Sequence, residues 1–142
     1  MKISFFLPMK TIPTVTSQEK GVNFSAHRIF TKPEVLDVKK EYISLLVPNR
    51  PKRPMRGPLK LTVVWCFPPQ DRAPAGTYKA TKPDTDNMIK LLKDCMTELS
   101  FWMDDAQVAV EHLSKGYDDP SGIFIEVHEL EVIECDADTS ER

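Results

Sequence analysis

The residues best suited to chemistry in this sequence are two aspartates, Asp84 and Asp86, in the run KPDTDN at residues 82–87. The run stands where an extended segment is expected to meet a helix. On extended backbone, side chains two positions apart point to the same side, so these two carboxylates are expected to share one ion. Carboxylate oxygens and water are the ligands that Mg²⁺ and Mn²⁺ prefer. The alternative is a helix cap, but one cap accounts for only one of the two carboxylates.

A second acidic pair, Asp104 and Asp105, follows the helix that begins after this run. A helix of about 13 residues is about 20 Å long, and the six residues 100–105 span about the same length when extended. The chain can therefore return and bring Asp105 level with Asp84 and Asp86. Three carboxylates that close together repel by roughly 1–4 kcal/mol per pair, and a divalent cation removes that cost. The alternative for the second pair is a polar turn that starts the next strand.

Lys90 lies one helical turn after Asp86 and is expected to project near the same end of the helix. An ammonium group beside a metal-bound phosphate neutralises negative charge that develops during phosphodiester cleavage. The alternative is an ordinary helix salt bridge to Asp86 or Asp94. We interpret Asp94, a further turn along, as a residue that orients Lys90 and does not bind metal.

The length and composition predict one globular domain. A chain of 142 residues holds one domain, here residues 1–133, followed by an acidic tail at 134–142. Hydrophobic residues make up 41% and charged residues 28%, as in an ordinary globular protein. The three cysteines form no C-x-x-C pair, and the apolar run at the start is too short for a signal peptide or a membrane span. A cytoplasmic protein without a membrane association is therefore expected.

Charge is distributed very unevenly along the chain. Residues 1–82 contain 15 Lys and Arg against 5 Asp and Glu, whereas residues 83–142 contain 4 against 16. Such polarity predicts a basic surface for a polyanion beside an acidic cluster that repels a polyanion until a cation neutralises it. The alternative is two solvated faces that attract each other within the fold.

Periodicity predicts the order β-α-β-α-β-β, an α/β or α+β class in which helices pack on a small mixed sheet. The strongest strand signal is the alternation of residues 59–67, and the strongest helix signal is an apolar stripe within residues 87–99. The last two strands, 107–115 and 122–132, flank a turn-rich segment and are predicted to pair as an antiparallel hairpin. The remaining predictions are a strand at 2–7, a loop at 8–24, a helix at 33–47 and a polar loop at 68–82.

Between the first helix and the central strand lies the segment PNRPKRPMRGP at residues 48–58, with four prolines and four basic residues. It is predicted to be an exposed arm. A solvated linker and a segment that contacts phosphates both remain open on this evidence.

The sequence resembles the RusA family of Holliday junction resolvases, which are of phage and prophage origin. The resemblance covers residues 80–116 and is carried, in order and spacing, by Lys82-Pro83-Asp84-x-Asp86-Asn87, Lys90, Asp94, Phe101-Trp102, Asp104-Asp105-x-Gln107-Val108 and Lys115. It implies a RusA-like fold and a homodimeric endodeoxyribonuclease that depends on Mg²⁺, with Mn²⁺ as a substitute. Its implied substrate is branched DNA, the four-way junction, cut by paired symmetric nicks in DNA recombination and repair.

The resemblance also implies roles for individual residues. It points to Asp84, Asp86 and Asp105 as the metal-binding triad and to Lys90 as the catalytic lysine, with Asp104 as a supporting residue. The sequence departs from the family's pattern at two positions outside this set: glycine is usual at Ser100, and a basic residue near Glu98.

The resulting hypothesis is a nuclease in which one or two Mg²⁺ ions polarise the scissile phosphate and activate a water molecule. Lys90 offsets the developing charge. Basic residues of the first part of the chain are expected to hold DNA phosphates without reading the base sequence. The candidates for these contacts are Lys10, Lys20, Arg28, Arg72, Lys79 and Lys82.

Three alternatives compete with junction resolution. The nearest is a nuclease of the same fold that prefers flaps or forks. The second is a DNA-binding module that keeps the fold but does not cut. The third is a glycosyltransferase that uses D-x-D to bind a sugar nucleotide, although 142 residues leave little room for a nucleotide-binding domain.

Overall fold

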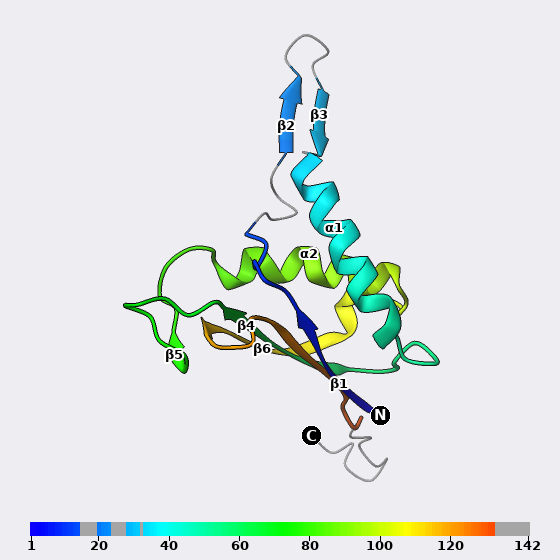
Figure 1. Ribbon diagram of the computed structural model, residues 1–142. Helices are drawn as coiled ribbons and strands as arrows, with labels where there is room; N and C mark the ends of the chain where they lie inside the picture. The colour runs from blue at the N-terminus through cyan, green and yellow to red at the C-terminus, as the bar shows by residue number, and fades with distance from the viewer. Residues whose placement is uncertain (15–19, 24–27, 32, 133–142) are drawn as a thin grey trace, which may run out of the picture.

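The computed structural model describes residues 1–14, 20–23, 28–31 and 33–132, with side chains described for 1–14 and 33–132. The predicted acidic tail lies outside these residues. The described chain forms a five-stranded sheet, a two-stranded hairpin and two α-helices (Figure 1). In chain order, the elements are β1 (Lys2–Pro8), β2 (Lys20–Asn23), β3 (Arg28–Thr31), α1 (Pro33–Leu46), the 3-10 helix η1 (Val47–Asn49), β4 (Leu59–Phe67), β5 (Thr77–Tyr78), α2 (Thr85–Glu98), the 3-10 helix η2 (Asp105–Gln107), β6 (Val108–Tyr117) and β7 (Gly122–Glu129).

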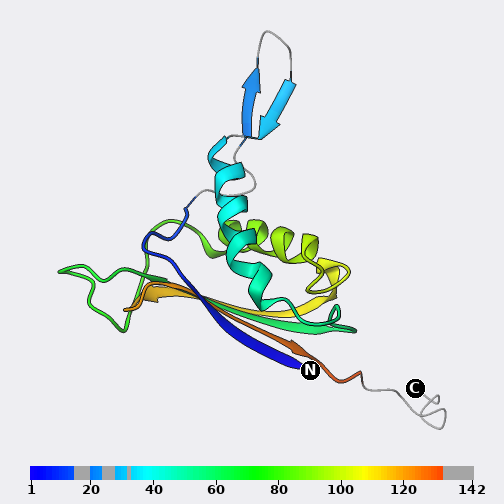
Figure 2. The same cartoon turned by 45° about the vertical axis from the view of Figure 1, so that its right-hand side comes forward.

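The sheet has the strand order β1-β7-β4-β6-β5. Strand β4 is parallel to β6 and antiparallel to β7, while β1 pairs antiparallel with β7 and β5 with β6. Both α-helices lie on one face of the sheet (Figure 2). The expected class, a mixed sheet with helices packed on it, is confirmed. Neither described helix is long and apolar enough to cross a membrane.

Strand β4 is central because its side chains alternate strictly between the core and the other face. Its core side is fully apolar and buried, and comprises Leu59, Leu61, Val63, Trp65 and Phe67. Burying this row of large side chains, at about 25 cal/mol per Å² of apolar surface, favours a position with a partner strand on each edge. The predicted strand at 59–67 is confirmed to the residue.

The predicted hairpin of residues 107–115 with 122–132 is wrong, because β4 lies between β6 and β7. The connection crosses the end of β4, where the backbone N–H of Asp118 donates to the carbonyl oxygen of Phe67 at 3.0 Å. Closeness in sequence favours pairing of neighbouring strands. In this fold β6 and β7 do not pair with each other, because each of them pairs with one edge of the buried strand β4.

Three short elements fall where loops or a strand start were predicted. Part of the expected loop at 8–24 forms β2, which pairs with β3, and part of the loop at 68–82 forms β5. Residue 107, the expected start of a strand, ends η2. Strands of two to four residues contain too few alternating positions to be recognised from sequence. They are defined by their backbone hydrogen bonds to a partner strand.

The two helices pack through the apolar stripes that the sequence predicted. Helix α2 buries Met88, Leu91, Leu92, Cys95 and Met96, and α1 buries Val35, Tyr42 and Leu46. After α2, Phe101 and Trp102 are fully buried, and the indole N–H of Trp102 donates to Thr97 Oγ1 at 2.8 Å. The aromatic pair therefore belongs to the core, as expected by default.

The stability of the fold should fall in alkaline solution. Burial raises the pKa of the Cys95 thiol from about 9 to about 12, and burial followed by the nearby Cys95 raises the pKa of Tyr42. Above pH 9 the unfolded thiol loses its proton while the folded thiol keeps it. The free energy of unfolding should therefore fall as the pH rises from about 9 towards 12, because the unfolded thiol binds fewer protons than the folded one. Urea unfolding measured between pH 9 and 12 tests this expectation. The free energy of unfolding of Cys95→Ala should fall less steeply with pH than that of the wild type.

Candidate active site

The first half of the candidate site is the start of α2. Asp84 occupies the N-cap position with extended backbone (φ −75°, ψ 141°), but its side chain makes no capping hydrogen bond. Asp86 lies within the first turn, and both side chains are exposed. The expected arrangement of both residues on extended backbone is wrong, because the helix begins between them. The carboxylate of Asp84 is nevertheless left available, so capping does not account for this aspartate.

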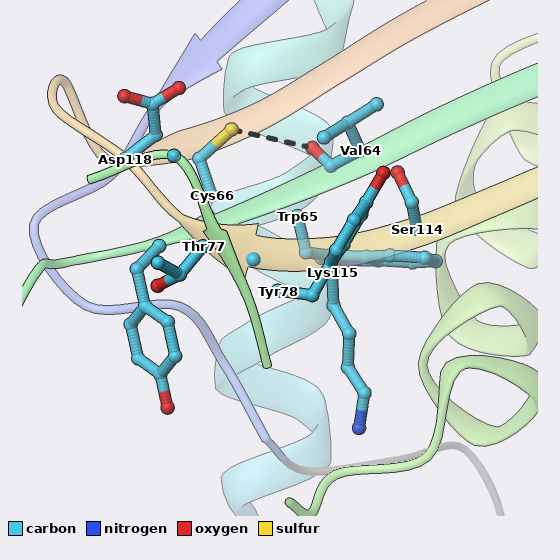
Figure 3. A pocket seen from close by; sticks show the side chains of 11 residues that line it. Val64, Trp65, Cys66, Thr77, Tyr78, Ser114, Lys115 and Asp118 are labelled. Carbon is cyan, nitrogen blue, oxygen red and sulfur yellow. Dashed lines mark hydrogen bonds between the residues drawn. The ribbon is translucent and has the colours of Figure 1, made fainter. Parts of the chain in front are cut away.

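Lys115 holds the segment that leads into this helix end. Its ammonium group donates to the carbonyl oxygens of Pro83, at 2.7 Å, and of Thr81. Figure 3 shows Lys115 projecting to the opposite side of β6 from Ser114, and its register partner is the buried Trp65 of β4. The lysine therefore ties the sheet to the residue directly before Asp84. Its place in the motif was visible in sequence, but this contact was not.

Lys79 is held beside Lys115 and is less available than expected. Its side chain donates to Thr81 Oγ1 at 2.9 Å, and its ammonium lies 5.0 Å from the ring centre of Phe67 and 5.3 Å from that of Tyr117. Cation–π contacts of this kind stabilise a packed lysine. Lys79 therefore helps to order the loop at 76–82 in addition to its predicted DNA contact.

The second half of the site is the short helix η2, which carries Asp105. Asp104 caps it by accepting from Ala106 N at 2.9 Å, while Gln107 Oε1 accepts from Asp104 N at 3.1 Å. This is a capping box, and the D-x-x-Q spacing is the sequence signal that would have revealed it. Asp104 thus has a structural task. Asp105 is exposed and takes no part in the cap.

One face of α2 carries Asp86, Lys90 and Asp94 at four-residue intervals. The pKa of Asp94 is raised, first by burial and then by the carboxylate of Asp105, while Lys90 and Lys39 act in the opposite direction. The fold therefore brings Asp105 into the electrostatic range of Asp94. The expected proximity of Asp94 to Lys90 also agrees with this influence.

The three predicted metal ligands do not form one cluster. Among the residues with described side chains, no three His, Cys, Asp or Glu are grouped so that they could hold a metal ion. The reason lies in the connection after α2, where Phe101 N donates to Met96 O and Met55 N donates to Phe101 O. These contacts hold Phe101 and its neighbours in the core. The segment after the helix is therefore not a free extended chain that returns along α2 towards Asp84. The charge of Asp105 acts on Asp94, and the assignment of Asp105 as a ligand together with Asp84 and Asp86 stays a prediction.

The predicted DNA contacts are distributed over separate elements. Lys10, Arg72 and Lys82 are exposed, as such contacts require, and Lys79 is half-buried. Lys20 lies on β2 and Arg28 on β3, and their side chains are outside the described set. These contacts stay predictions.

If the site cuts DNA junctions as the sequence resemblance implies, replacing Lys115 by methionine should lower cleavage by about tenfold while junction binding stays within about twofold of wild type. The variant loses two charge-assisted hydrogen bonds, each worth about 1.5–3 kcal/mol, and releases the backbone before Asp84. Single-turnover cleavage and binding in the presence of chelator separate the two effects. Lys115→Arg, which keeps a donor, should recover part of the rate. A loss of binding equal to the loss of cleavage would assign Lys115 to DNA contact instead.

With this geometry established, comparison with known proteins gives the class, an endodeoxyribonuclease. The family model described as "Endodeoxyribonuclease RusA" matches residues 10–128. The chain is also 31% identical over 136 residues to "Crossover junction endodeoxyribonuclease rusA" of Lactococcus phage r1t, and the match covers 92% of this chain and 100% of that protein. The chain belongs to the RusA endodeoxyribonuclease family. The resemblance seen in the sequence is thereby confirmed, and nucleases of this family generally use a divalent metal ion.

Proposed function

We propose that this endodeoxyribonuclease resolves four-way DNA junctions by paired, symmetric nicks. The main support is the near full-length similarity to a crossover junction endodeoxyribonuclease. The observation that connects this activity with the structure is the start of α2, where Asp84 and Asp86 are exposed and Lys115 fixes the backbone before them. Membership of the family excludes the glycosyltransferase alternative.

The proposed metal ion is Mg²⁺, with Mn²⁺ as a substitute, and its proposed ligands are Asp84, Asp86 and Asp105. The donors fit in kind, since all three offer exposed carboxylate oxygens, which these hard cations prefer. Burial and then the charge of Asp105 raise the pKa of Asp94, and a cation near this face of α2 would offset the part due to Asp105. When bound, the ion polarises the scissile phosphate and lowers the pKa of a water molecule.

The remaining steps fall to the protein's own side chains. Lys90, exposed one turn after Asp86, is proposed to offset negative charge on the phosphate as the bond breaks. Asp94 orients Lys90, and Asp104 keeps η2 in place through its cap. The basic residues Lys10, Lys20, Arg28, Arg72, Lys79 and Lys82 are proposed to hold the DNA backbone.

A homodimer is part of the proposal because a four-way junction is itself symmetric. Two identical subunits related by a two-fold axis would present one site to each of two opposed strands, which gives paired nicks. The expected location is the cytoplasm, where DNA is accessible. The two cysteines in the described chain, Cys66 and Cys95, are free thiols, in keeping with a reducing compartment.

The test is cleavage of a synthetic four-way junction, a fork, a flap and a linear duplex of matched sequence, each with Mg²⁺ and with chelator. Symmetric nicks in the junction at low enzyme concentration, absent with chelator, are expected. Preference for the flap or the fork would replace junction resolution by the branched-DNA alternative. Binding without cutting of any substrate would favour the non-catalytic module.

A further inference from the structure

The basic arm, residues 48–58, is an ordered part of the structure despite its lack of regular sheet or helix beyond η1. Met55 is fully buried, forms a parallel bridge with Trp102 and donates its N–H to Phe101 O at 2.8 Å. A solvated linker would not need a buried side chain or backbone hydrogen bonds to the core, so these contacts of Met55 argue against that alternative. The arm is therefore held in a fixed position on the core.

The arm is hydrogen-bonded to the short helix η2, which also carries Asp105. The side-chain amide of Gln107 donates to the carbonyl oxygens of Met55, at 3.2 Å, and Gly57, at 3.0 Å. Gln107 ends the helix η2 that Asp105 begins. Arg56, which is exposed, lies between the two residues that Gln107 holds, so it is positioned next to this part of the candidate active site.

The charges of the arm are mostly left without acidic partners. Arg53 forms an ion pair with Glu129 at 3.2 Å. For Arg50, Lys52 and Arg56, no ion pair exists with any acidic residue whose side chain the structure describes. Arg50, Lys52 and Arg53 also line an open hollow of about 400 Å³ with Leu99 and Ser100. Like charges held this close repel, and an anionic ligand removes that repulsion.

We propose that the basic arm binds the phosphodiester backbone of DNA beyond Asp105, through Arg50, Lys52 and Arg56. This inference rests on the proposed function and extends it to a further surface, next to the loop that carries Asp105. Arginine suits this task because its planar group forms paired hydrogen bonds with phosphate oxygens. The contacts carry no base information, so the arm increases affinity for every substrate and fixes the position of the strand relative to the carboxylates.

The experiment compares two double variants that each remove two positive charges. Arg50→Gln/Arg56→Gln changes the arm. The matched control, Lys2→Gln/Lys60→Gln, changes the sheet face without helices, since both lysines are register partners of His128 on that face. Binding of a four-way junction is measured in chelator over a range of salt concentrations, and the thermal midpoint of each variant shows whether it folds.

The arm variant should bind the junction roughly tenfold more weakly. The slope of log K against log [salt] should become shallower by about 1.8, since each phosphate that the protein no longer neutralises lowers it by about 0.9. The control should change both values by much less. Equal effects of the two variants, or wild-type binding by the folded arm variant, would overturn the proposal for the arm alone. Absence of junction binding by the wild-type protein would instead overturn the proposed function.

Discussion

Asp86→Asn should abolish most junction cleavage, with a loss of at least about 10²- to 10³-fold in the single-turnover rate, the scale seen when one charge-stabilising group is removed from an active site. The substitution keeps the size of the side chain and removes its charge. Asp86 is exposed in the first turn of α2, and no described cationic side chain forms an ion pair with it. The variant should therefore keep its fold. Loss of a negative charge facing DNA should leave binding unchanged or slightly tighter.

The measurement is cleavage of a four-way junction with saturating Mg²⁺, together with binding of the same junction in chelator. Asp37→Asn provides the control, because Asp37 is likewise an exposed aspartate in a helix but lies on α1. It should cut like the wild type. If Asp86→Asn and Asp37→Asn cut at the same rate, the carboxylates at the start of α2 have no part in the chemistry.

The parts of the fold that were predictable are those with many repeats of one period. Strand β4 shows nine alternating residues, and α2 shows an apolar stripe over more than three turns. The insertion of β4 between β6 and β7 could not be read in this way. Periodicity reports which face of an element is buried, whereas strand order depends on how the elements share the core.

The same contrast applies to the site. The residue types and spacing of Asp84, Asp86 and Lys90 predict their chemistry from the sequence alone, and these roles stay predictions. The contacts that position these residues act from side chain to backbone across long stretches of chain, as from Lys115 to Pro83 and from Gln107 to Met55. A lysine or glutamine that binds a carbonyl oxygen leaves no periodic signal in sequence. The path of the chain after α2 depends on such contacts, so sequence spacing alone does not fix the position of Asp105.

Asp105→Asn is the second substitution with a large expected effect. Asp105 is exposed and takes no part in the η2 cap, and after burial its charge is the next cause of the raised pKa of Asp94. A cation bound by Asp105 would relieve the part of that effect that comes from its charge. We therefore expect cleavage to fall by about 10²-fold or more and junction binding in chelator to persist.

Metal binding gives this prediction a second, independent readout. A ligand that binds the folded state raises the thermal midpoint to an extent that grows with its affinity, so Mn²⁺ should stabilise the wild type more than Asp105→Asn. Asp119→Asn, an exposed aspartate before β7, is the matched control and should respond like the wild type. An Asp105→Asn variant that cuts normally and is stabilised equally by Mn²⁺ would remove Asp105 from the metal site. The carboxylates that bind the ion would then be sought on α2 itself, since Asp94 already lies on the same face of that helix as Asp86.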